Sequence, residues 1–171
     1  SLRDYSLSSA VPLEDLIRPF EIPLKGKVRK IGVEICEDLW FNDYGYKEKP
    51  LNVSRYLIEN GAELLINISS SPWTHGKDRA RDNRIRDLLK ETSAFVPFYY
   101  VNCVGTQNNG KNVVVFDGES TVYSVKGEVL KTASKPYEEE LLVHESGMEN
   151  PSLPRKSLDK IEAKYRAILQ G

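Results

Sequence analysis

A thiol beside two carboxylates is the pattern in this sequence that most suggests chemistry. Cys36 closes the β-branched segment 28–36 and is followed directly by Glu37 and Asp38. Strand ends in α/β sheets often carry nucleophiles, because the sheet fixes the side chain while the next loop stays open. A thiol there can attack a carbonyl carbon if a base takes its proton or a cation stabilises the thiolate. The alternative is that Cys36 is a small buried hydrophobic residue, as many free cysteines are.

The second cysteine has a different sequence environment. Cys103 lies in the aromatic-rich segment 97–105 with no polar cluster beside it, so we interpret it as a core residue. Two cysteines far apart in the sequence predict no disulfide framework. With two histidines and no CxxC spacing, the sequence also predicts no metal site.

Composition and charge exclude several classes of partner. The formal net charge is −1, so no global charge recruits nucleic acid or an anionic membrane. Four arginines on the predicted helix 77–95 alternate with aspartates, which indicates an ion-paired, solvated face or a subunit contact: Arg79, Arg81, Arg84 and Arg86. No apolar run approaches the roughly 18 residues of a membrane span, and the first residues lack signal-peptide features. We therefore expect a cytoplasmic protein with no nucleic-acid or membrane partner.

The predicted elements that position Cys36 alternate between strands and helices. We predict strands at 28–36, 63–68 and 97–105, and helices at 51–60 and 77–95. A meander of three short strands should occupy 112–134, and 140–145 should close the sheet. Residues 1–27 are predicted to be an irregular lead-in with one helical turn at 13–17, and 150–171 a linker followed by a helix that Ser157 caps. This order indicates an α/β fold.

Five motifs, in order along the chain, carry a family resemblance. They are IGVEICEDLW, NGAELLINISSSPW, Lys77, YYVNCVG and VVVFDGEST. Together they closely resemble the successive motifs of the nitrilase, or carbon-nitrogen hydrolase, superfamily. Within it they match the glutaminase domain of glutamine-dependent NAD synthetases. The resemblance implies part of a four-layer αββα sandwich, with residues 28–149 as its C-terminal half and the N-terminal half missing.

The resemblance also implies a reaction and its residues. Cys36 would attack the side-chain amide of glutamine, form a thioester and release ammonia for the ATP-dependent amidation of deamido-NAD to NAD. Ser71 and Lys77 match the family's glutamine-binding serine and basic residue, and Glu37 would bind the α-ammonium group. The backbone N–H of Glu37 would face the developing oxyanion. ATP and Mg would belong to a synthetase domain of the parent chain, no cofactor to this segment, and a homo-oligomer is expected.

Simpler interpretations of the binding residues stay open at this point. Ser71 belongs to a Ser-Ser-Ser-Pro run that predicts a turn. Lys77 could be a solvated charge at a helix start, although a cation there is slightly unfavourable to the helix dipole. The aromatic residues after the nucleophile could line a pocket or pack the loop: Trp40, Phe41, Tyr44 and Tyr46.

The sequence departs from the family pattern upstream of the nucleophile. The family's triad adds a glutamate base and a lysine from motifs that precede the cysteine. Lys25, Lys27 and Lys30 are too close to the nucleophile strand to serve, and Glu14 and Glu21 lack the surrounding motif. We therefore expect a piece of a larger protein that pairs with another chain and is inactive alone. The alternatives are another amidase of the superfamily, or a non-catalytic assembly module.

Overall fold

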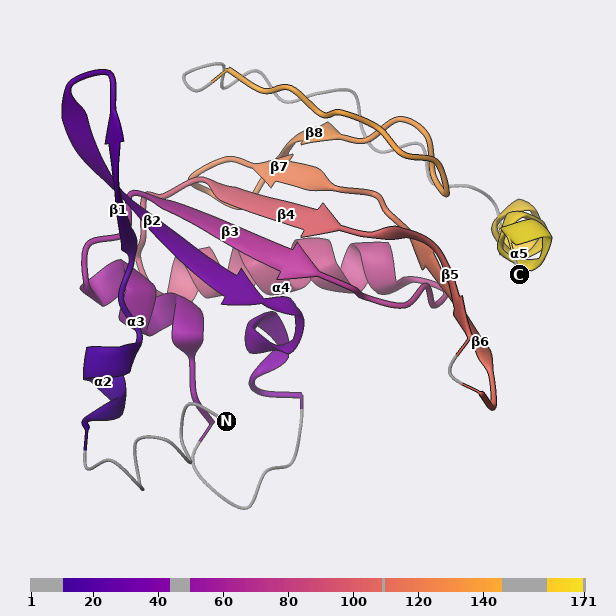
Figure 1. Ribbon diagram of the computed structural model, residues 1–171, viewed down its shortest axis with the longest axis horizontal. Coiled ribbons are helices and arrows are strands. Elements are labelled where there is room, and N and C mark those ends of the chain that lie inside the picture. Colours follow the sequence, from indigo (N-terminus) through magenta and orange to yellow (C-terminus); the bar gives the residue numbers. More distant parts are fainter. Residues whose placement is uncertain (1–10, 44–49, 109, 146–159, 171) are drawn as a thin grey trace.

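A mixed six-stranded sheet forms the centre of the molecule (Figure 1). The computed structural model describes residues 11–43, 50–108, 110–145 and 160–170. Strands follow one another across the sheet in the order β1-β2-β3-β4-β7-β8. Their bounds are β1 (Phe20–Leu24), β2 (Lys27–Ile35), β3 (Leu64–Ser69), β4 (Phe98–Asn102), β7 (Thr121–Tyr123) and β8 (Val129–Thr132).

Parallel pairing in the middle of the sheet creates the edge at which Cys36 lies. Strands β2, β3 and β4 are parallel, and β1, β7 and β8 pair antiparallel to their neighbours. Helix α3 (Val53–Glu59) connects β2 to β3, and α4 (Lys77–Glu91) connects β3 to β4. Both helices cover the same face of the sheet (Figure 1). The carboxyl ends of the three parallel strands therefore meet at one edge, where ligand sites of α/β sheets form.

The hydrophobic core fills the space between this face and the two helices. Leu57 of α3, Ile85 of α4, Leu65 of β3 and Phe98 of β4 are at most 2% exposed and belong to one cluster. Gly32 of β2 permits the close approach of α3: a Cβ there would lie 2.6 Å from Leu65 Cδ2 and 3.1 Å from Leu57 Cβ. The helix face of the sheet is thus tightly packed.

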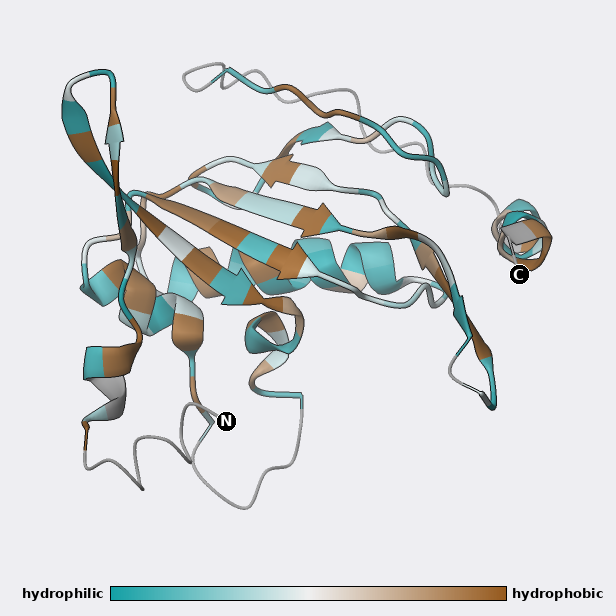
Figure 2. Cartoon of the chain, viewed as in Figure 1, coloured by the Kyte–Doolittle hydropathy of each residue, from teal (hydrophilic) through white to brown (hydrophobic). Residues whose placement is uncertain are grey.

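The opposite face of the sheet is apolar and is exposed at the carboxyl ends of β2, β3 and β4. Ile35, Ile68 and Val101 lie side by side in the strand register and are 67%, 53% and 47% exposed. Hydropathy colouring shows hydrophobic residues recurring along β2, β3 and β4 (Figure 2). We call the row Ile35–Ile68–Val101 the open face. Such a row on a folded chain indicates a surface that another segment or chain covers.

The remaining elements surround the sheet. They are α2 (Leu13–Leu16), the 3-10 helix η1 (Cys36–Trp40), β5 (Val104–Asn108), β6 (Val113–Asp117) and α5 (Lys160–Gln170). Strands β5 and β6 form a separate two-stranded sheet. No helix among the described residues has the length and apolar character that crossing a membrane requires.

Several predicted elements differ from the observed ones. The lead-in contains β1, which pairs with β2 through a Lys25-Gly26 turn, so residues 20–24 are not irregular. All five β1 residues are exposed, which is why no buried period marks the strand in the sequence. The predicted three-strand meander is wrong, because β6 pairs with β5 while β7 and β8 join the main sheet. Residues 140–145 form no strand, and the linker 150–156 and Ser157 lie outside the described residues.

Candidate active site at the Cys36 turn

Cys36 occupies a strained backbone position at the end of β2. Its φ is +44°, in the left-handed region, and it is the first residue of η1. We call η1 (Cys36–Trp40) the Cys36 turn. A left-handed conformation in a residue with a Cβ costs about 1–2 kcal/mol, so it persists only where the surroundings hold it. The turn projects a half-buried thiol from the end of a rigid strand.

Two side chains hold the start of the Cys36 turn. Asp38 accepts a hydrogen bond from the backbone N–H of Ile35, with Oδ2 2.8 Å from the nitrogen. Asn67 of β3 donates through Nδ2 to the carbonyl oxygen of Cys36 at 3.5 Å. Burial raises the pKa of Asp38, while the Ile35 N–H favours its charged form. The turn is thus fixed on both sides of the nucleophile.

Arginines of α4 contribute to the site from inside the protein. Arg84 donates from Nε to the carbonyl oxygen of Leu39 at 2.9 Å, which ties the end of the turn to α4. Arg81 is 3% exposed, lies 4.2 Å above the ring of Tyr100 and pairs with Glu119 at 3.4 Å. The predicted solvated arginine face is therefore wrong at these two positions, because the helix turns them toward the sheet.

A buried carboxyl lies directly behind the turn. Glu34 of β2 is 1% exposed and accepts hydrogen bonds from the hydroxyl of Ser54 and from Asn67 Nδ2, the latter at 3.0 Å. Burial raises the pKa of Glu34 to about 7, although both hydrogen bonds favour the charged form. Neither Glu34 nor Asn67 was predicted from the sequence as a site residue. Their signal was a polar residue at an inward position of an otherwise apolar strand.

Ser71 is held by a second asparagine in the same manner. Its backbone N–H donates to Asn102 Oδ1 at 2.9 Å, and Asn102 Nδ2 donates back to the Ser71 carbonyl at 3.3 Å. Both residues are buried, with 4% and 7% exposure. The predicted turn at 69–72 is therefore wrong: Ser69 ends β3, and residues 70–72 form an irregular segment whose position Asn102 fixes.

Lys77 brings a positive charge to the nucleophile. It is the first residue of α4, after Gly76 with a φ of +81°, and its Nζ donates to the Pro72 carbonyl at 3.3 Å. Partial burial lowers the pKa of Lys77, while the nearby Cys36 thiolate and Asp117 favour the charged form. The residues that flank Cys36 directly in the sequence, Glu37 and Asp38, supply no cation. The fold supplies one from a different element.

One groove of about 620 Å³ contains all four residues singled out from the sequence: Cys36, Glu37, Ser71 and Lys77. Its other lining residues are Trp40, Asp43, Ser70, Pro72, Thr74, His75, Gly76 and Ala80. Phe41 is not among them, and its ring lies 4.5 Å below the Arg84 guanidinium. Tyr44 and Tyr46 lie outside the described residues.

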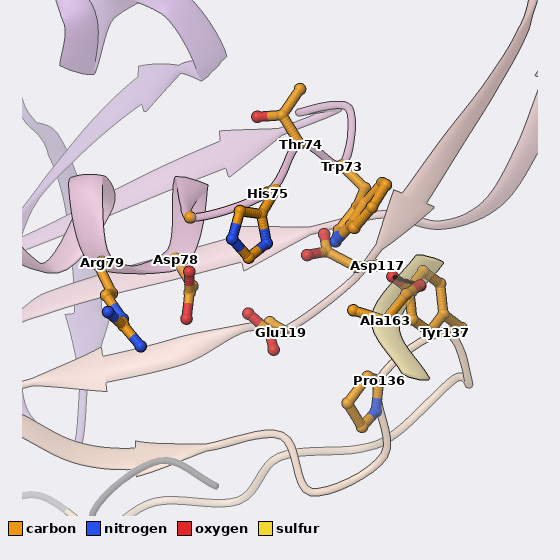
Figure 3. A pocket seen from close by; sticks show the side chains of 11 residues that line it. Trp73, Thr74, His75, Asp78, Arg79, Asp117, Glu119, Pro136, Tyr137 and Ala163 are labelled. Atoms are coloured by element: carbon orange, nitrogen blue, oxygen red, sulfur yellow. Dashed lines mark hydrogen bonds between the residues drawn. The ribbon is translucent and has the colours of Figure 1, made fainter. Parts of the chain in front are cut away.

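A smaller pocket adjoins the groove across the loop 74–76 (Figure 3). The side chains of His75, Asp117 and Glu119 point into it from different segments. Tyr137 donates its hydroxyl to the carbonyl of Ala163 at 3.2 Å, which places α5 against this pocket. Burial, Asp117 and Glu119 together raise the pKa of Tyr137. Helix α5 thus lies beside the loop that shapes the groove.

Cys103 is not a plain core residue. It is half-buried, and its Sγ lies 3.1 Å from the Ser70 hydroxyl, so the prediction of a purely apolar environment is wrong. Both cysteines are free thiols. Among the described residues, no group of three His, Cys, Asp or Glu side chains is arranged to hold a metal ion.

The comparisons with known proteins agree on a family. The carbon-nitrogen hydrolase family model matches residues 3–149, and thus extends into the predicted lead-in. A glutamine-dependent NAD(+) synthetase from Synechocystis sp. is 38% identical over 103 residues, covering 59% of this chain and 17% of the relative. One from Xylella fastidiosa is 32% identical over 146 residues, covering 82% and 24%. The chain therefore spans about a fifth of the length of these relatives.

The fold comparison points the same way. The structure of a glutamine-dependent NAD+ synthetase from Acinetobacter baumannii, with ADP bound, superimposes with a TM-score of 0.69 at 24% identity. The superposition covers 89% of this chain and 26% of that one. The mixed α/β fold of this chain is therefore also found in one part of that larger protein.

Proposed function

Because the chain belongs to the carbon-nitrogen hydrolase family, we propose that it carries the glutamine-hydrolysing site of a glutamine-dependent NAD synthetase. The relatives it matches over most of its length bear that name. The chain spans only 17–24% of the length of the relatives described above, so the synthetase reaction is assigned to parts that they have in addition.

The observation that carries the proposal is that Cys36, Ser71 and Lys77 line the same groove. A thiol on a left-handed turn, a buried serine and a half-buried ammonium share one groove, although they come from two strand ends and a helix start. A hydroxyl and a cation suit the α-carboxylate of free glutamine. Glu37, exposed at the groove, suits the α-ammonium group.

The chemistry follows from these positions. The Cys36 thiolate attacks the side-chain amide carbon, so a C–S bond forms and the carbonyl oxygen becomes an oxyanion. The backbone N–H of Glu37 is the expected donor to that oxygen. When the oxyanion collapses, the C–N bond breaks and the nitrogen leaves as ammonia after accepting a proton. Water then hydrolyses the thioester to glutamate and regenerates the thiol.

The partners follow from the same assignment. The ammonia is consumed in the ATP-dependent amidation of deamido-NAD, for which a synthetase domain holds ATP and Mg. A cytoplasmic location and a homo-oligomeric assembly belong to this proposal.

The 171-residue chain alone should not turn over glutamine. Its family uses a glutamate as base and a lysine at the tetrahedral intermediate, and this sequence has no counterpart of either motif. Within the described residues, no carboxylate is hydrogen-bonded to the Cys36 thiol. Members of a triad act as a unit, so losing them removes most of the rate. Incubation with glutamine should release no ammonia above that of the Cys36→Ala variant.

The decisive test uses a full-length enzyme that contains this segment, the family's glutamate and lysine motifs and a synthetase domain. Cys36→Ala should abolish glutamine-dependent NAD formation, because the nucleophile is lost, while free ammonia still supports it. Cys103→Ala is the matched control and should retain glutamine-dependent activity. If Cys36→Ala retained glutamine-dependent turnover, the assignment would be wrong. Hydrolysis of other amides in preference to glutamine would favour a different amidase.

A further inference from the structure

The carboxyl behind the nucleophile has a specific hydrogen-bonding arrangement. Glu34 on β2 and Asn67 on β3 are direct neighbours in the parallel register, and both face the helices. They are 1% and 0% exposed. A polar pair in a hydrophobic core is unfavourable unless its groups are bonded. Here the bonds lead from Glu34 through Asn67 to the backbone of Cys36.

The contacts of Asn67 fix the orientation of its amide. Its Nδ2 donates to Glu34 Oε1 at 3.0 Å and to the Cys36 carbonyl at 3.5 Å, and its Oδ1 accepts from the Ser69 hydroxyl at 2.5 Å. If the amide were reversed, its oxygen would face the Cys36 carbonyl oxygen and the two acceptors would repel. The accepting oxygen of Glu34 is therefore what keeps the amino group of Asn67 directed at Cys36.

We propose that Glu34 is a positioning residue for the Cys36 nucleophile and acts through Asn67. The inference rests on the proposed function only in taking Cys36 as the reactive thiol. The acceptor on Glu34 orients the Asn67 amide, and the amide holds the carbonyl of a residue whose backbone is left-handed. Without that bond the Cys36 turn relaxes, and the thiol moves from its place beside Lys77.

The role depends on an acceptor rather than on a charge. Glu34 faces the hydroxyl of Ser54 on α3 and the amide of Asn67 on β3, and it interacts electrostatically with Asp38 and Arg84. A carboxylate accepts from both Ser54 and Asn67. A neutral carboxyl can keep its carbonyl oxygen toward Asn67 and direct its O–H at Ser54. A glutamine at this position has the same option.

The two cysteines allow a test inside one molecule. The 171-residue chain is treated with iodoacetamide, and the alkylation of Cys36 and Cys103 is followed separately by peptide mass spectrometry. Glu34→Met removes the acceptor and keeps a side chain of similar size. It should slow the alkylation of Cys36 about five- to tenfold relative to that of Cys103. Glu34→Gln should restore the ratio to within about twofold of the wild type. This readout requires no glutamine hydrolysis, so it is independent of the proposed function.

The outcomes separate positioning from a general structural role. A purely structural role would loosen the fold and accelerate both thiols, which would overturn the proposal, as would an unchanged ratio in Glu34→Met. If Glu34→Gln were as slow as Glu34→Met, the charge and not the acceptor would matter, and the proposal would be wrong. Should Glu34→Met fail to fold by circular dichroism, Asn67→Ser tests the same link, since serine cannot reach the Cys36 carbonyl. It should lower the ratio to the same extent.

Discussion

At the scale of single residues, the site depends on side chains that hold other residues in place. Asn67 and Asn102 each bind the backbone of a loop that follows a parallel strand, one at Cys36 and the other at Ser71. Neither was predicted from the sequence: a polar residue in an apolar strand can be noticed there, but its spacing does not reveal which backbone group it binds. Cys36 could be found because a thiol at a strand end is unusual, and Lys77 because of the family motif.

Lys77 is predicted to act on glutamine binding. Removing a charge-assisted contact costs about 1.5–3 kcal/mol when fully desolvated, and somewhat less for a half-buried lysine. In a glutamine-hydrolysing enzyme with this site, Lys77→Ala should therefore raise KM for glutamine about tenfold with a smaller effect on kcat. Steady-state kinetics of ammonia release would measure both constants.

Arg79→Ala is the matched control for Lys77. It removes an exposed cation two residues further along α4. Arg79 lines the smaller pocket and does not line the groove. Its KM should equal that of the wild type. A fall in kcat at constant KM in Lys77→Ala would instead assign the lysine to the thiol.

Glu34 should make the stability of the chain depend on pH. Its pKa is about 7 in the folded protein against an ordinary value of 4.5, so the folded state holds the proton more tightly. The stabilisation is complete below pH 4.5 and is lost as the pH rises through 7. The loss is on the order of 3 kcal/mol. Glu34→Gln cannot ionise and serves as the reference. The free energy of unfolding of the wild type, relative to that of Glu34→Gln, should be highest up to about pH 4.5 and should fall progressively toward pH 8.

Urea unfolding of the wild type and of Glu34→Gln across this pH range would measure the effect. Ser54→Ala is the companion variant. The Ser54 hydrogen bond lowers the pKa of Glu34. Its removal should therefore raise this pKa further and extend the loss of stability to higher pH. A difference between wild type and Glu34→Gln that does not change with pH would contradict the assignment.

At the scale of elements, the sequence predicted best those segments that are buried on a regular period. The strands around Cys36, 63–68 and 97–105, and both crossover helices, correspond to β2, β3, β4, α3 and α4. Exposed or paired segments were not predictable in this way. Strand β1 has no inward face, and the partner of β6 is chosen by tertiary contacts beyond the range of a turn signal. Phe95, the last residue of the predicted helix 77–95, lies beyond the end of α4 and is 79% exposed.

The turn between β7 and β8 should be sensitive to a single methyl group. Gly127 has a φ of +75°, and a Cβ there would lie 2.5 Å from Arg86 Cα of α4. Gly26, in the turn between β1 and β2, has a φ of +77° with nothing within 4 Å. Gly26→Ala should cost about 1 kcal/mol for the backbone conformation alone. Gly127→Ala should cost about 1–3 kcal/mol more, because the turn must move off the helix.

Denaturant unfolding of both glycine variants gives the difference directly. Equal losses would mean that the turn does not pack against α4 as the structure describes. The comparison isolates the contact, since the backbone strain is nearly the same at the two positions.

At the scale of the whole molecule, the order of the motifs along the chain predicted the family and the α/β fold. The motifs did not reveal which face of the sheet is left exposed. The open face is a property of three strands together, and alternation in one strand does not reveal what lies opposite. Its three exposed aliphatic side chains predict that copies of the chain associate through it.

Ile68→Lys should weaken that association. The charge would lie in the centre of the open face, where burying it without a partner costs several kcal/mol, so the association constant should fall roughly tenfold or more. Sedimentation over a concentration series would measure it. Phe95→Lys, at an even more exposed apolar site outside the open face, should associate as the wild type does. Identical behaviour of both variants would place the contact elsewhere.

Helix α4 limits the insertions and deletions that this region of the chain can accept. Its first residue, Lys77, brings the cation to the groove, and Arg84 ties the Cys36 turn to the helix through Leu39. Arg84 lies seven positions after Lys77, which is about two turns and about 10 Å of helix. Inserting or deleting one residue between them would rotate one end by about 100° relative to the other, so only one contact could survive. We expect natural variants to differ in length at the exposed Lys25-Gly26 turn, and to keep the number of residues between 77 and 84 fixed.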